Sequence, residues 1–385
     1  MRPPVPLVVF SHLRWDFVFQ RPQHLMTRIA ARRPVHFIEE PVPGAASAHW
    51  TRTEPAAGVT VHRPHTPVHA HGFSEEQLAV LLGMVRDLVR AEGAGGGIAW
   101  MYTPLALPLL GAVRPAATVY DCMDELSLFL HAPPELLPRE AALLQRADVV
   151  FTGGPSLFEA KRDRHPNVHC FPSSVDAAHF AAGADRPEPA DQAAIPRPRL
   201  GFYGVIDERL DLPLIDAIAT RHPAWQVVMV GPVVKIDPAT LPRRPNIHYL
   251  GQRTYEELPA YLAGWDVSLL PFARNDATRF ISPTKTLEYM TVERPIVSTP
   301  IADVAGPYGD IVHLGDGPEG FLAACEAAMA SSAGERARRA RGMRQVLGRT
   351  SWDATADAMN RIIEDILSRK APERSGTSLT AAGAS

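Results

Sequence analysis

Residues 199–231 read RLGFYGVIDERLDLPLIDAIATRHPAWQVVMVG, and this stretch decides the fold. An apolar run of strand length at 199–203 is followed by a polar loop, a helical pattern that begins near Pro213, and a second apolar run at 226–230. Short apolar runs separated by helical patterns are typical of parallel sheets whose two faces are covered by helices. The stretch therefore predicts one strand-helix-strand unit of a parallel sheet.

The same alternation recurs on both sides of this unit. Strands are predicted in the first half at 6–11, 35–39, 98–102, 118–121, 149–152 and 168–171, and in the second at 199–203, 226–230, 247–250, 267–271, 295–299 and 311–314. The predicted fold class is α/β, with two Rossmann-like doubly wound parallel-sheet domains facing a cleft. In such sheets ligands bind outside the carboxyl ends of the strands, so the loops there are the candidate sites.

The domain boundaries follow from composition. The predicted units are an N-terminal domain at 1–180, a linker at 181–198, a C-terminal domain at 199–350, a helix at 351–369 that packs back on the N-terminal domain, and a disordered tail at 370–385. The linker is assigned because its segment is rich in Ala, Pro, Asp and Arg and offers little to bury. The tail is assigned because it is rich in Ser, Thr, Ala and Gly.

Composition also excludes several classes of protein. The chain has 385 residues, a net charge of -3 and three widely spaced cysteines, so neither a nucleic-acid binder nor a disulfide scaffold is expected. No apolar stretch approaches the roughly 18 residues of a membrane span, and the start of the chain lacks the long apolar core of a secretory signal. These features predict a cytoplasmic protein.

The clearest candidate site lies at 279–290, RFISPTKTLEYM. Ser282 is predicted as a helix N-cap and Pro283 as the first helical residue, which makes Lys285 the third. A cation there opposes the helix dipole unless an anion shares the site, and a phosphate would resolve the conflict. Glu288, on the same face, would accept hydrogen bonds from sugar hydroxyls. The alternative is an exposed Lys285 paired with Glu288, and the nearby Arg279 shifts the balance toward the anion site.

Three further loops follow predicted strands. The loop that begins at Gly204 holds Arg209, which suits a phosphate clamp or simply a polar turn. The segment at 120–125 offers carboxylates, of which Asp121 and Asp124 could orient a hydroxyl or instead cap the next helix. The loop after the first strand gathers charged and aromatic residues and is interpreted as a binding loop, with a capping loop as the alternative; its candidates are His12, Arg14, Trp15, Asp16 and Arg21.

Two other clusters carry weaker signals. His62, His65, His69 and His71 lie in a predicted Pro-rich connection, which seldom offers the fixed geometry of a metal site, so no metal is expected. Arginines at 336–344 predict a basic helical patch, interpreted as a solvated face, with a weak peripheral contact to an anionic membrane surface as the alternative.

At this point the residues resemble the group-one glycosyltransferases, the large retaining "family four" with the GT-B two-domain architecture. The resemblance spans nearly the whole chain. Its parts are FSHLRWDFVFQRPQH at the start, YDCMDE, CFPSSVD, GFYGV, VVMVGP, NIHYLGQ, WDVSLLPF, SPTKTLEYM and RPIVST. The opening is similar to that of a bacterial subset that builds cell-envelope and exopolysaccharide glycans.

The resemblance implies a donor site in the second half. Glu288 matches the carboxylate that binds the nucleotide ribose, Lys285 and Arg209 match cations on the donor diphosphate, and 251–253 match the segment that meets the base. The predicted donor-binding residues are Glu288, Lys285, Arg209, Arg279, Ser282, Thr284, Gly251, Gln252, Arg253 and Gly204. Such enzymes retain the anomeric configuration and need no metal or other cofactor.

The resemblance also implies an acceptor side in the first half. The predicted catalytic residues are Asp121, Asp124, Lys285 and Arg209, and the predicted acceptor-side residues are His12, Arg14, Trp15, Asp16 and Arg21. The expected partners are a nucleotide-sugar donor, with UDP favoured because most relatives use it, and a glycan or lipid-linked acceptor.

Two departures from the family pattern matter. Phe280 stands where the family often has a Glu that contacts the donor sugar, and Asp121 stands where it often has a His. A sugar-nucleotide epimerase of the same fold and a non-catalytic nucleotide-sugar binding protein are the alternative functions. The sequence does not determine the sugar, the acceptor, the linkage or the oligomeric state.

Overall fold

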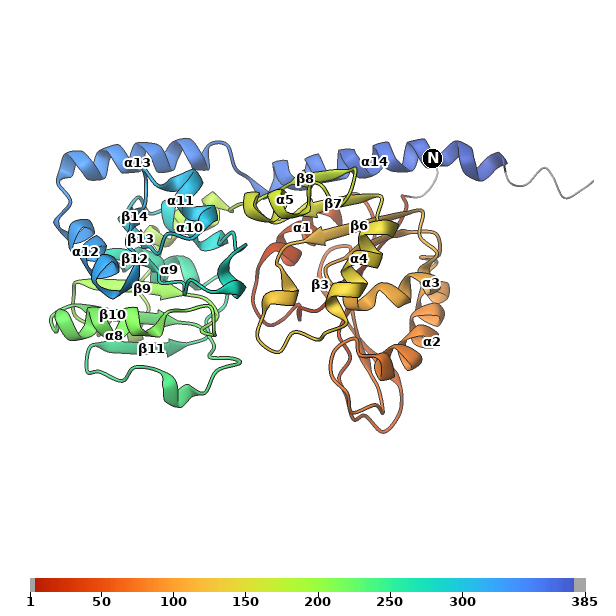
Figure 1. The fold of residues 1–385 in the computed structure, drawn as a ribbon, viewed down its shortest axis with the longest axis horizontal. Coiled ribbons are helices and arrows are strands. Elements are labelled where there is room, and N and C mark those ends of the chain that lie inside the picture. Colours follow the sequence, from red (N-terminus) through yellow and green to blue (C-terminus); the bar gives the residue numbers. More distant parts are fainter. Residues whose placement is uncertain (1–3, 377–385) are drawn as a thin grey trace, which may run out of the picture.

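The computed structural model describes residues 4–376, which form two α/β domains lying side by side (Figure 1). The N-terminal domain is built on an eight-stranded sheet of order β3-β4-β2-β1-β5-β6-β7-β8, and the C-terminal domain on a six-stranded sheet of order β11-β10-β9-β12-β13-β14. All pairings are parallel except that of β3 with β4. The predicted fold class is confirmed.

Except for β3 and β4, which were not predicted, the strands of the two sheets agree with the apolar runs of the sequence. They are β1 (Leu7–Ser11), β2 (Val35–Glu39), β3 (His49–Ala56), β4 (Val59–His65), β5 (Ile98–Met101), β6 (Ala117–Cys122), β7 (Val149–Thr152), β8 (Val168–Cys170), β9 (Arg199–Tyr203), β10 (Gln226–Val230), β11 (Ile247–Gly251), β12 (Val267–Leu270), β13 (Ile296–Ser298) and β14 (His313–Leu314). The central ones are buried along their whole length because helices cover both faces of each sheet.

The α-helices are α1 (Arg21–Ile29), α2 (Glu75–Ala91), α3 (Leu110–Val113), α4 (Leu136–Arg146), α5 (Pro155–Lys161), α6 (Ala177–Ala181), α7 (Ala190–Ala193), α8 (Leu212–Arg221), α9 (Leu258–Ala263), α10 (Thr284–Met290), α11 (Ala302–Tyr308), α12 (Gly317–Ala330), α13 (Ala333–Leu347) and α14 (Trp352–Gly376). Short 3₁₀ turns are η1 (Pro104–Leu109), η2 (Leu126–Leu128), η3 (Ala182–Asp185), η4 (Pro238–Thr240) and η5 (Asp276–Thr278). No helix among the described residues is long and apolar enough to span a bilayer.

The strand order fixes where a ligand can bind. The chain reverses its winding direction between β1 and β5 in the first sheet, and between β9 and β12 in the second. At such a switch point neighbouring loops diverge and leave a crevice at the carboxyl ends of the strands. In the C-terminal domain the loop after β9 lies against the loop after β12, since the amide of Ala273 donates to the carbonyl of Arg209 at 2.8 Å.

The last helix returns to the first domain. α14 packs against α1, and Trp352, Met359 and Ile363 are buried in the apolar cluster that also contains the side chains of β1 and β7 (Figure 1). The tail is predicted to begin at Lys370, but α14 continues to Gly376. The ion pair of Lys370 with Asp148 (2.5 Å) holds the helix to the domain at that point. Residues 377–385 of the predicted tail lie outside the described residues.

Two predictions about connections are wrong. The predicted Pro-rich connection contains the hairpin β3–β4, and both His62 and His65 lie on β4, where Pro64 is tolerated because this strand is near the sheet edge. The predicted linker is also folded. Gln192 of α7 is fully buried, donates to the carbonyl of Tyr261 and accepts from Nε1 of Trp265 at 2.8 Å, so the segment packs on the C-terminal domain.

Candidate active site

The site is a cleft between the two domains that consists of two adjoining cavities. The inner cavity has a volume of about 160 Å³ and is lined by Arg21, Asp124, Arg209, Lys285 and Glu288, among others. The outer cavity has a volume of about 500 Å³ and lies between the loop after β1 and the segment that follows β11. Both cavities share Gly204 and Tyr255 in their walls, so a single elongated ligand could occupy them together.

Helix α10 brings Lys285 into the inner cavity. The predicted N-cap Ser282 is wrong by one residue: Pro283, with an extended ψ of 117°, is the N-cap, the helix begins at Thr284, and Lys285 is its second residue. No side chain caps this helix end, so its first N–H groups have no capping partner. Ser282 and Thr284, which the sequence predicts as donor-binding residues, both line the inner cavity.

Lys285 is a cation without a counter-ion. Its ammonium makes no ion pair with any described residue, so the alternative pairing with Glu288 is not formed. Burial lowers the pKa of Lys285, and the charge of Arg209 lowers it further, although Glu288 opposes the shift. Two neighbouring cations in a half-enclosed cavity favour the binding of an anion there.

Gly204 makes room for the Lys285 side chain. A Cβ at position 204 would overlap Cε of Lys285 and lie 2.7 Å from its Nζ, and the φ of +135° also favours glycine. The backbone after β9 therefore approaches the lysine more closely than any residue with a side chain would allow. This contact explains why a glycine follows the strand directly at this point.

Glu288 is held by a buried tyrosine. The hydroxyl of Tyr203, the last residue of β9, donates to Oε2 of Glu288 at 2.6 Å, and the hydroxyl of Tyr289 accepts from the Tyr203 amide at 3.1 Å. Burial raises the pKa of Glu288, while the Tyr203 hydrogen bond and Lys285 lower it. With Oε2 engaged by Tyr203, Oε1 is the oxygen left to accept from a ligand hydroxyl.

Arg209 is oriented by its own loop. Nε and Nη2 of Arg209 bind the two oxygens of the buried Asp207 at 3.0 and 2.7 Å, a two-pronged contact that fixes the plane of the guanidinium. The guanidinium carbon also lies 5.6 Å from the ring centre of Phe129 in the N-terminal domain. The sequence pattern gives no sign of either partner's role, because Asp207 is an ordinary loop carboxylate and Phe129 is distant in the chain.

The end of β6 and the segment after it contain three carboxylates, and these differ in their partners. Asp121 is fully buried and binds Arg21 through two oxygens at 2.8–3.1 Å. Glu125 pairs with the buried Lys161 at 2.6 Å. A role for Asp121 on the acceptor is therefore not supported, because its oxygens are already engaged by the guanidinium.

Asp124 is the carboxylate of this segment whose side chain has no partner among the described residues. It lines the inner cavity from the N-terminal side and forms no side-chain hydrogen bond or ion pair with a described residue. Burial raises the pKa of Asp124 to about 6, although Arg209, Arg21 and Lys235 oppose the shift. The contacts of Asp121 and Glu125 hold the loop on either side of Asp124. Asp124 shares the inner cavity with the cations of the C-terminal domain, Arg209 and Lys285.

The predicted binding loop after β1 is mostly structural. Arg14 binds the buried Glu39 at 3.1 Å, Trp15 packs edge-on to Phe37 at 5.1 Å, and Asp16 is paired with Arg63 at 3.0 Å. Arg14 is therefore removed from the candidate acceptor residues because β2 supplies its counter-ion. Trp15 and Asp16 line the outer cavity, opposite 252–258, and not the inner cavity beside Asp124.

His12 and Arg21 lie nearer the predicted acceptor side. Arg21 lines the inner cavity, but its guanidinium is committed to Asp121 and to the carbonyl of Phe171 at 2.8 Å. Nδ1 of His12 is buried without a hydrogen-bond partner among the described residues. Burial and the Lys235 charge lower the pKa of His12 to about 4, so this ring is neutral at neutral pH.

The remaining donor candidates divide between the cavity and the surface. Gln252 and Arg253 line the outer cavity, and Gly251 forms the end of β11 beside them. Arg279 is 61% exposed, pairs with Asp276 at 2.8 Å and lines neither cavity, so its prediction as a donor residue is not supported. Phe280 packs against the apolar cluster of the N-terminal domain instead of lining the inner cavity.

The sequence missed several residues of the site. Tyr203 contacts Glu288, and Asp207 contacts Arg209. Tyr255 lines the inner cavity, and the charge of Lys235 lowers the pKa of Asp124. Only Tyr203 had a usable signal, since it ends a predicted strand directly before Gly204. Within residues 4–376 no group of three or more His, Cys, Asp or Glu could hold a metal ion.

Two α/β domains, each built on a mainly parallel sheet, with a cleft between them define the GT-B class of folds. Residues 197–333 match the family model described as glycosyl transferases group 1. Over 302 residues the chain is 25% identical to a Bacillus subtilis (strain 168) protein described as "Putative teichuronic acid biosynthesis glycosyltransferase TuaH", covering 73% of this chain and 75% of the relative.

Solved structures share the same fold. Sucrose-phosphate synthase from Thermosynechococcus elongatus has a TM-score of 0.70 at 16% identity, covering 94% of this chain and 99% of that one. The E. coli structure described as trehalose-6-phosphate bound with UDP-2-fluoro glucose has a TM-score of 0.68 at 13% identity, with 94% and 99% covered. Anabaena Alr3699/HepE in complex with UDP and glucose has a TM-score of 0.63 at 13% identity, with 94% and 100% covered.

Together these matches confirm the resemblance noted in the sequence. Residues 197–333 match a group 1 glycosyltransferase domain, and the chain has the GT-B architecture.

Proposed function

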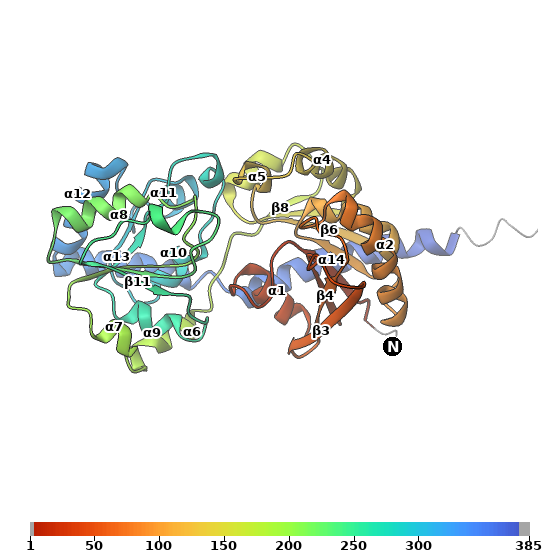
Figure 2. The same ribbon diagram turned by 90° about the horizontal axis from the view of Figure 1, so that it is seen from below.

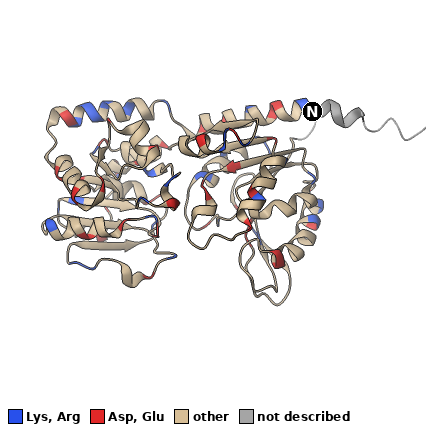
Figure 3. Cartoon of the chain, in the orientation of Figure 1, with Lys and Arg blue, Asp and Glu red and all other residues tan. Residues whose placement is uncertain are grey.

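We propose that this protein transfers a sugar from a UDP-linked donor to a glycan or lipid-linked acceptor of a bacterial envelope polysaccharide, with retention of the anomeric configuration and without a metal. The Bacillus relative is named for teichuronic acid biosynthesis, and two structural neighbours hold UDP or a UDP-sugar analogue. The proposed location is the cytoplasm, with weak peripheral contact at the inner face of the membrane through the arginine-bearing helix α13 (Figure 3).

The observation that carries the proposal is the unpaired Lys285. It faces the inner cavity together with Arg209, and its ammonium forms no ion pair with a described carboxylate. A leaving diphosphate has the charge and the oxygen atoms to satisfy both cations, and the uncapped start of α10 adds N–H donors. Glu288 would hold the ribose through Oε1, and the outer cavity beside Gln252 and Arg253 would hold the base.

The mechanism follows from the two sides of the cleft. The bond between the anomeric carbon and the diphosphate oxygen breaks on the face on which the acceptor oxygen attacks, and the acceptor proton passes to the departing phosphate oxygen. Lys285 and Arg209 stabilise the negative charge that develops on the diphosphate. Asp124, ionised above its pKa of about 6, accepts a hydrogen bond from the acceptor hydroxyl and aims its oxygen at the anomeric carbon.

Thermal shift with nucleotides tests the donor site. Wild type, Lys285→Ala and Glu288→Ala are melted with UDP, GDP and ADP in EDTA, with Lys370→Ala as the matched control because Lys370 lies on α14, in a surface ion pair with Asp148. We expect a UDP-selective rise in melting temperature that Lys285→Ala and Glu288→Ala abolish and Lys370→Ala preserves. A rise that survives EDTA supports metal-free binding, whereas no rise with any nucleotide contradicts the donor-site assignment.

Product analysis separates this function from its alternatives. The protein is incubated with UDP-sugars and a membrane-glycan extract, and the products are examined by mass spectrometry and NMR. A new glycoside with the anomeric configuration of the donor supports the proposal. An epimerised UDP-sugar formed without acceptor would identify an epimerase, and UDP binding with neither product would identify a non-catalytic binding protein.

A further inference from the structure

At one point of contact between the domains, a carboxylate of the C-terminal domain caps a helix of the N-terminal domain. Asp303, the second residue of α11 in the C-terminal domain, is buried, and its Oδ1 accepts a hydrogen bond from the amide of Ser156 at 3.0 Å. Ser156 is the second residue of α5 in the N-terminal domain. Figure 2 shows α5 on the side of the N-terminal domain that faces α11. Buried carboxylates are costly unless they are hydrogen-bonded, so this contact depends on the two domains being together.

The backbone at this contact has no room for a side chain. A Cβ on Gly154 would overlap Oδ2 of Asp303 and lie 2.6 Å from Cβ of Ser282. Ser282 lines the inner cavity just before α10. The loop between β7 and α5 therefore packs directly on the segment that leads into the donor helix, and glycine at 154 permits the approach.

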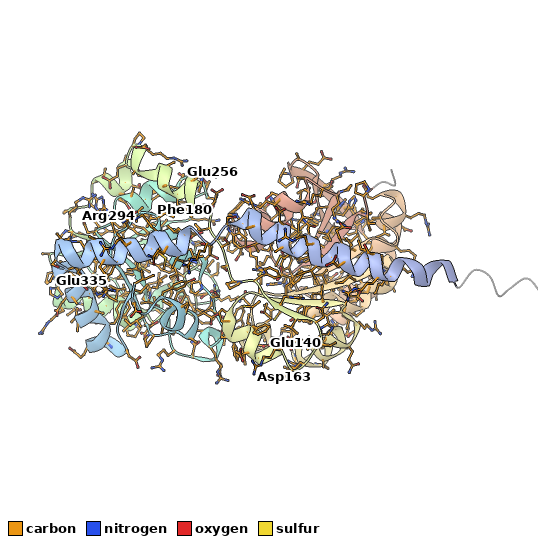
Figure 4. All side chains as sticks on the ribbon, turned by 90° about the horizontal axis from the view of Figure 1, so that it is seen from above. Glu140, Asp163, Phe180, Glu256, Arg294 and Glu335 are labelled. Carbon is orange, nitrogen blue, oxygen red and sulfur yellow. The ribbon has the colours of Figure 1, made fainter. Side chains whose placement is uncertain are left out.

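The same loop and helix hold the segment that carries Asp124. The amide of Gly153 donates to the carbonyl of Cys122 at 2.9 Å, and a Cβ on Gly153 would lie 2.7 Å from the carbonyl oxygen of Met123. At the other end of α5, Nζ of the buried Lys161 binds Glu125 Oε2 and Glu140 Oε1, both at 2.6 Å. Glu140, labelled in Figure 4, is thereby part of the anchor of this loop.

A continuous set of contacts therefore runs from the C-terminal domain to Asp124. Asp303 binds the start of α5, Gly153 binds the strand end at Cys122, and Lys161 at the end of α5 binds Glu125. Asp124 lies between the last two contacts and has no side-chain partner of its own. Its position relative to Lys285 is thus set by how α5 docks on the C-terminal domain.

We infer that Asp303 is a positioning residue of the transfer reaction, which docks α5 on the C-terminal domain and so places Asp124 opposite the donor cations. This inference rests on the proposed function. Asp303 itself touches neither cavity, so its effect reaches the reaction through Ser156, Gly154 and the loop at 122–125. Burial raises the pKa of Asp303, which is in keeping with a carboxylate enclosed by the interface.

The experiment compares Asp303→Ala and Asp303→Asn with the control Asp237→Ala. Asp237 also accepts a hydrogen bond from a backbone amide, that of Ala239 at 2.9 Å, but within one domain. Because Asp303→Ala removes a charge-assisted hydrogen bond across the domain contact, we expect kcat to fall about tenfold or more in this variant, with the donor KM within about twofold. Asp303→Asn keeps an acceptor oxygen and should recover most of the loss, and Asp237→Ala should match wild type.

Two further measurements separate positioning from a purely structural role. Hydrogen exchange at the amides of α5 should accelerate in Asp303→Ala and not in Asp237→Ala. Adding Asp303→Ala to Asp124→Asn should lower kcat by less than about twofold, since both changes act on the same group. Full additivity of the two losses, or an Asp303→Ala variant with wild-type kcat and wild-type exchange, would overturn the inference.

Hydrogen exchange also distinguishes failure of this inference from failure of the proposed function. If wild type forms no glycoside while Asp303→Ala still loosens α5, the proposed function fails and the positioning role for catalysis falls with it, leaving only the domain contact. If wild type transfers sugar and Asp303→Ala is unchanged in both measurements, the proposed function stands and the inference fails.

Discussion

In the N-terminal wall of the cleft, Arg21 is paired with Asp121, whereas in the C-terminal wall Lys285 has no counter-ion. Both walls place charged side chains at the carboxyl ends of parallel strands, and the sequence offered both as candidate binding sites. The N-terminal charges mostly neutralise one another and hold loops in place. In the C-terminal wall Arg209 is likewise held by Asp207, but Lys285 is left to meet a ligand, which teaches that a charged loop indicates a binding site only where a charge lacks a protein partner.

The largest effect is expected from removing the unpaired cation. Lys285→Ala should lower kcat/KM by about 10²–10³-fold because the leaving diphosphate loses a direct contact. Its melting temperature should equal or exceed that of wild type, since burial lowers the pKa of Lys285 and the empty site gains nothing from the charge. Steady-state kinetics and calorimetry check both, with Lys370→Ala as control. A large loss of stability would mean that Lys285 is structural.

Breaking the paired charge of the opposite wall should instead destabilise the fold. Asp121→Asn leaves the buried Arg21 without a counter-ion, and the free energy of unfolding should fall by about 3 kcal/mol or more. Urea denaturation measures the change. Wild-type stability in this variant would contradict the structural role given to the pair and return Asp121 to the candidate acceptor residues.

Asp124 lies three residues after Asp121, and Asp124→Asn should have the opposite effect: it should lower activity without destabilising the fold. We expect kcat to fall about 100-fold while the free energy of unfolding at pH 7.5 rises by about 1 kcal/mol, because the raised pKa means that the folded state disfavours the ionised carboxylate. In wild type, kcat/KM should decline as the pH falls through about 6, and Asp124→Asn should lack this limb. A limb that persists in the variant would assign it to another group.

Tyr203→Phe should give a smaller effect confined to donor binding. Loss of the hydrogen bond to Oε2 leaves Glu288 less well oriented and raises its pKa further, so the donor KM should rise about threefold to tenfold with little change in kcat. Titration calorimetry with UDP at pH 6 and pH 8 should show a greater loss of affinity at pH 6, where more Glu288 is protonated. An equal loss at both values would indicate a packing effect alone.

The smallest effect is expected at Arg279. Its guanidinium is exposed and paired with Asp276, so Arg279→Ala should leave kcat, donor KM and stability within about twofold of wild type. The same kinetic assay as for Lys285→Ala checks it. A tenfold loss would show that the 276–280 turn moves into the cleft when a donor binds.

The alternation of apolar runs with helical patterns predicted most of the fold, because a strand that is buried on both faces of its sheet consists of a continuous apolar run. It missed the hairpin β3–β4, whose first strand is largely exposed and carries no such run. In the site, Lys285 and Glu288 were predictable because they share one helix and a local pattern. The contacts of Tyr203 with Glu288 and of Asp303 with Ser156 were not, since the partners lie 85 and 147 residues apart in the chain.

The sequence by itself determined the two-sheet architecture, the helix that bears Lys285 and Glu288, and the glycosyltransferase resemblance, because these rest on local periodicity and short motifs. Only the tertiary structure decided which charges are free. Asp121 and Asp124 are the same residue type three positions apart, yet one lies beside Arg21 in the core and the other opens into the cleft. That difference depends on what the fold brings beside each carboxylate, which no local pattern specifies.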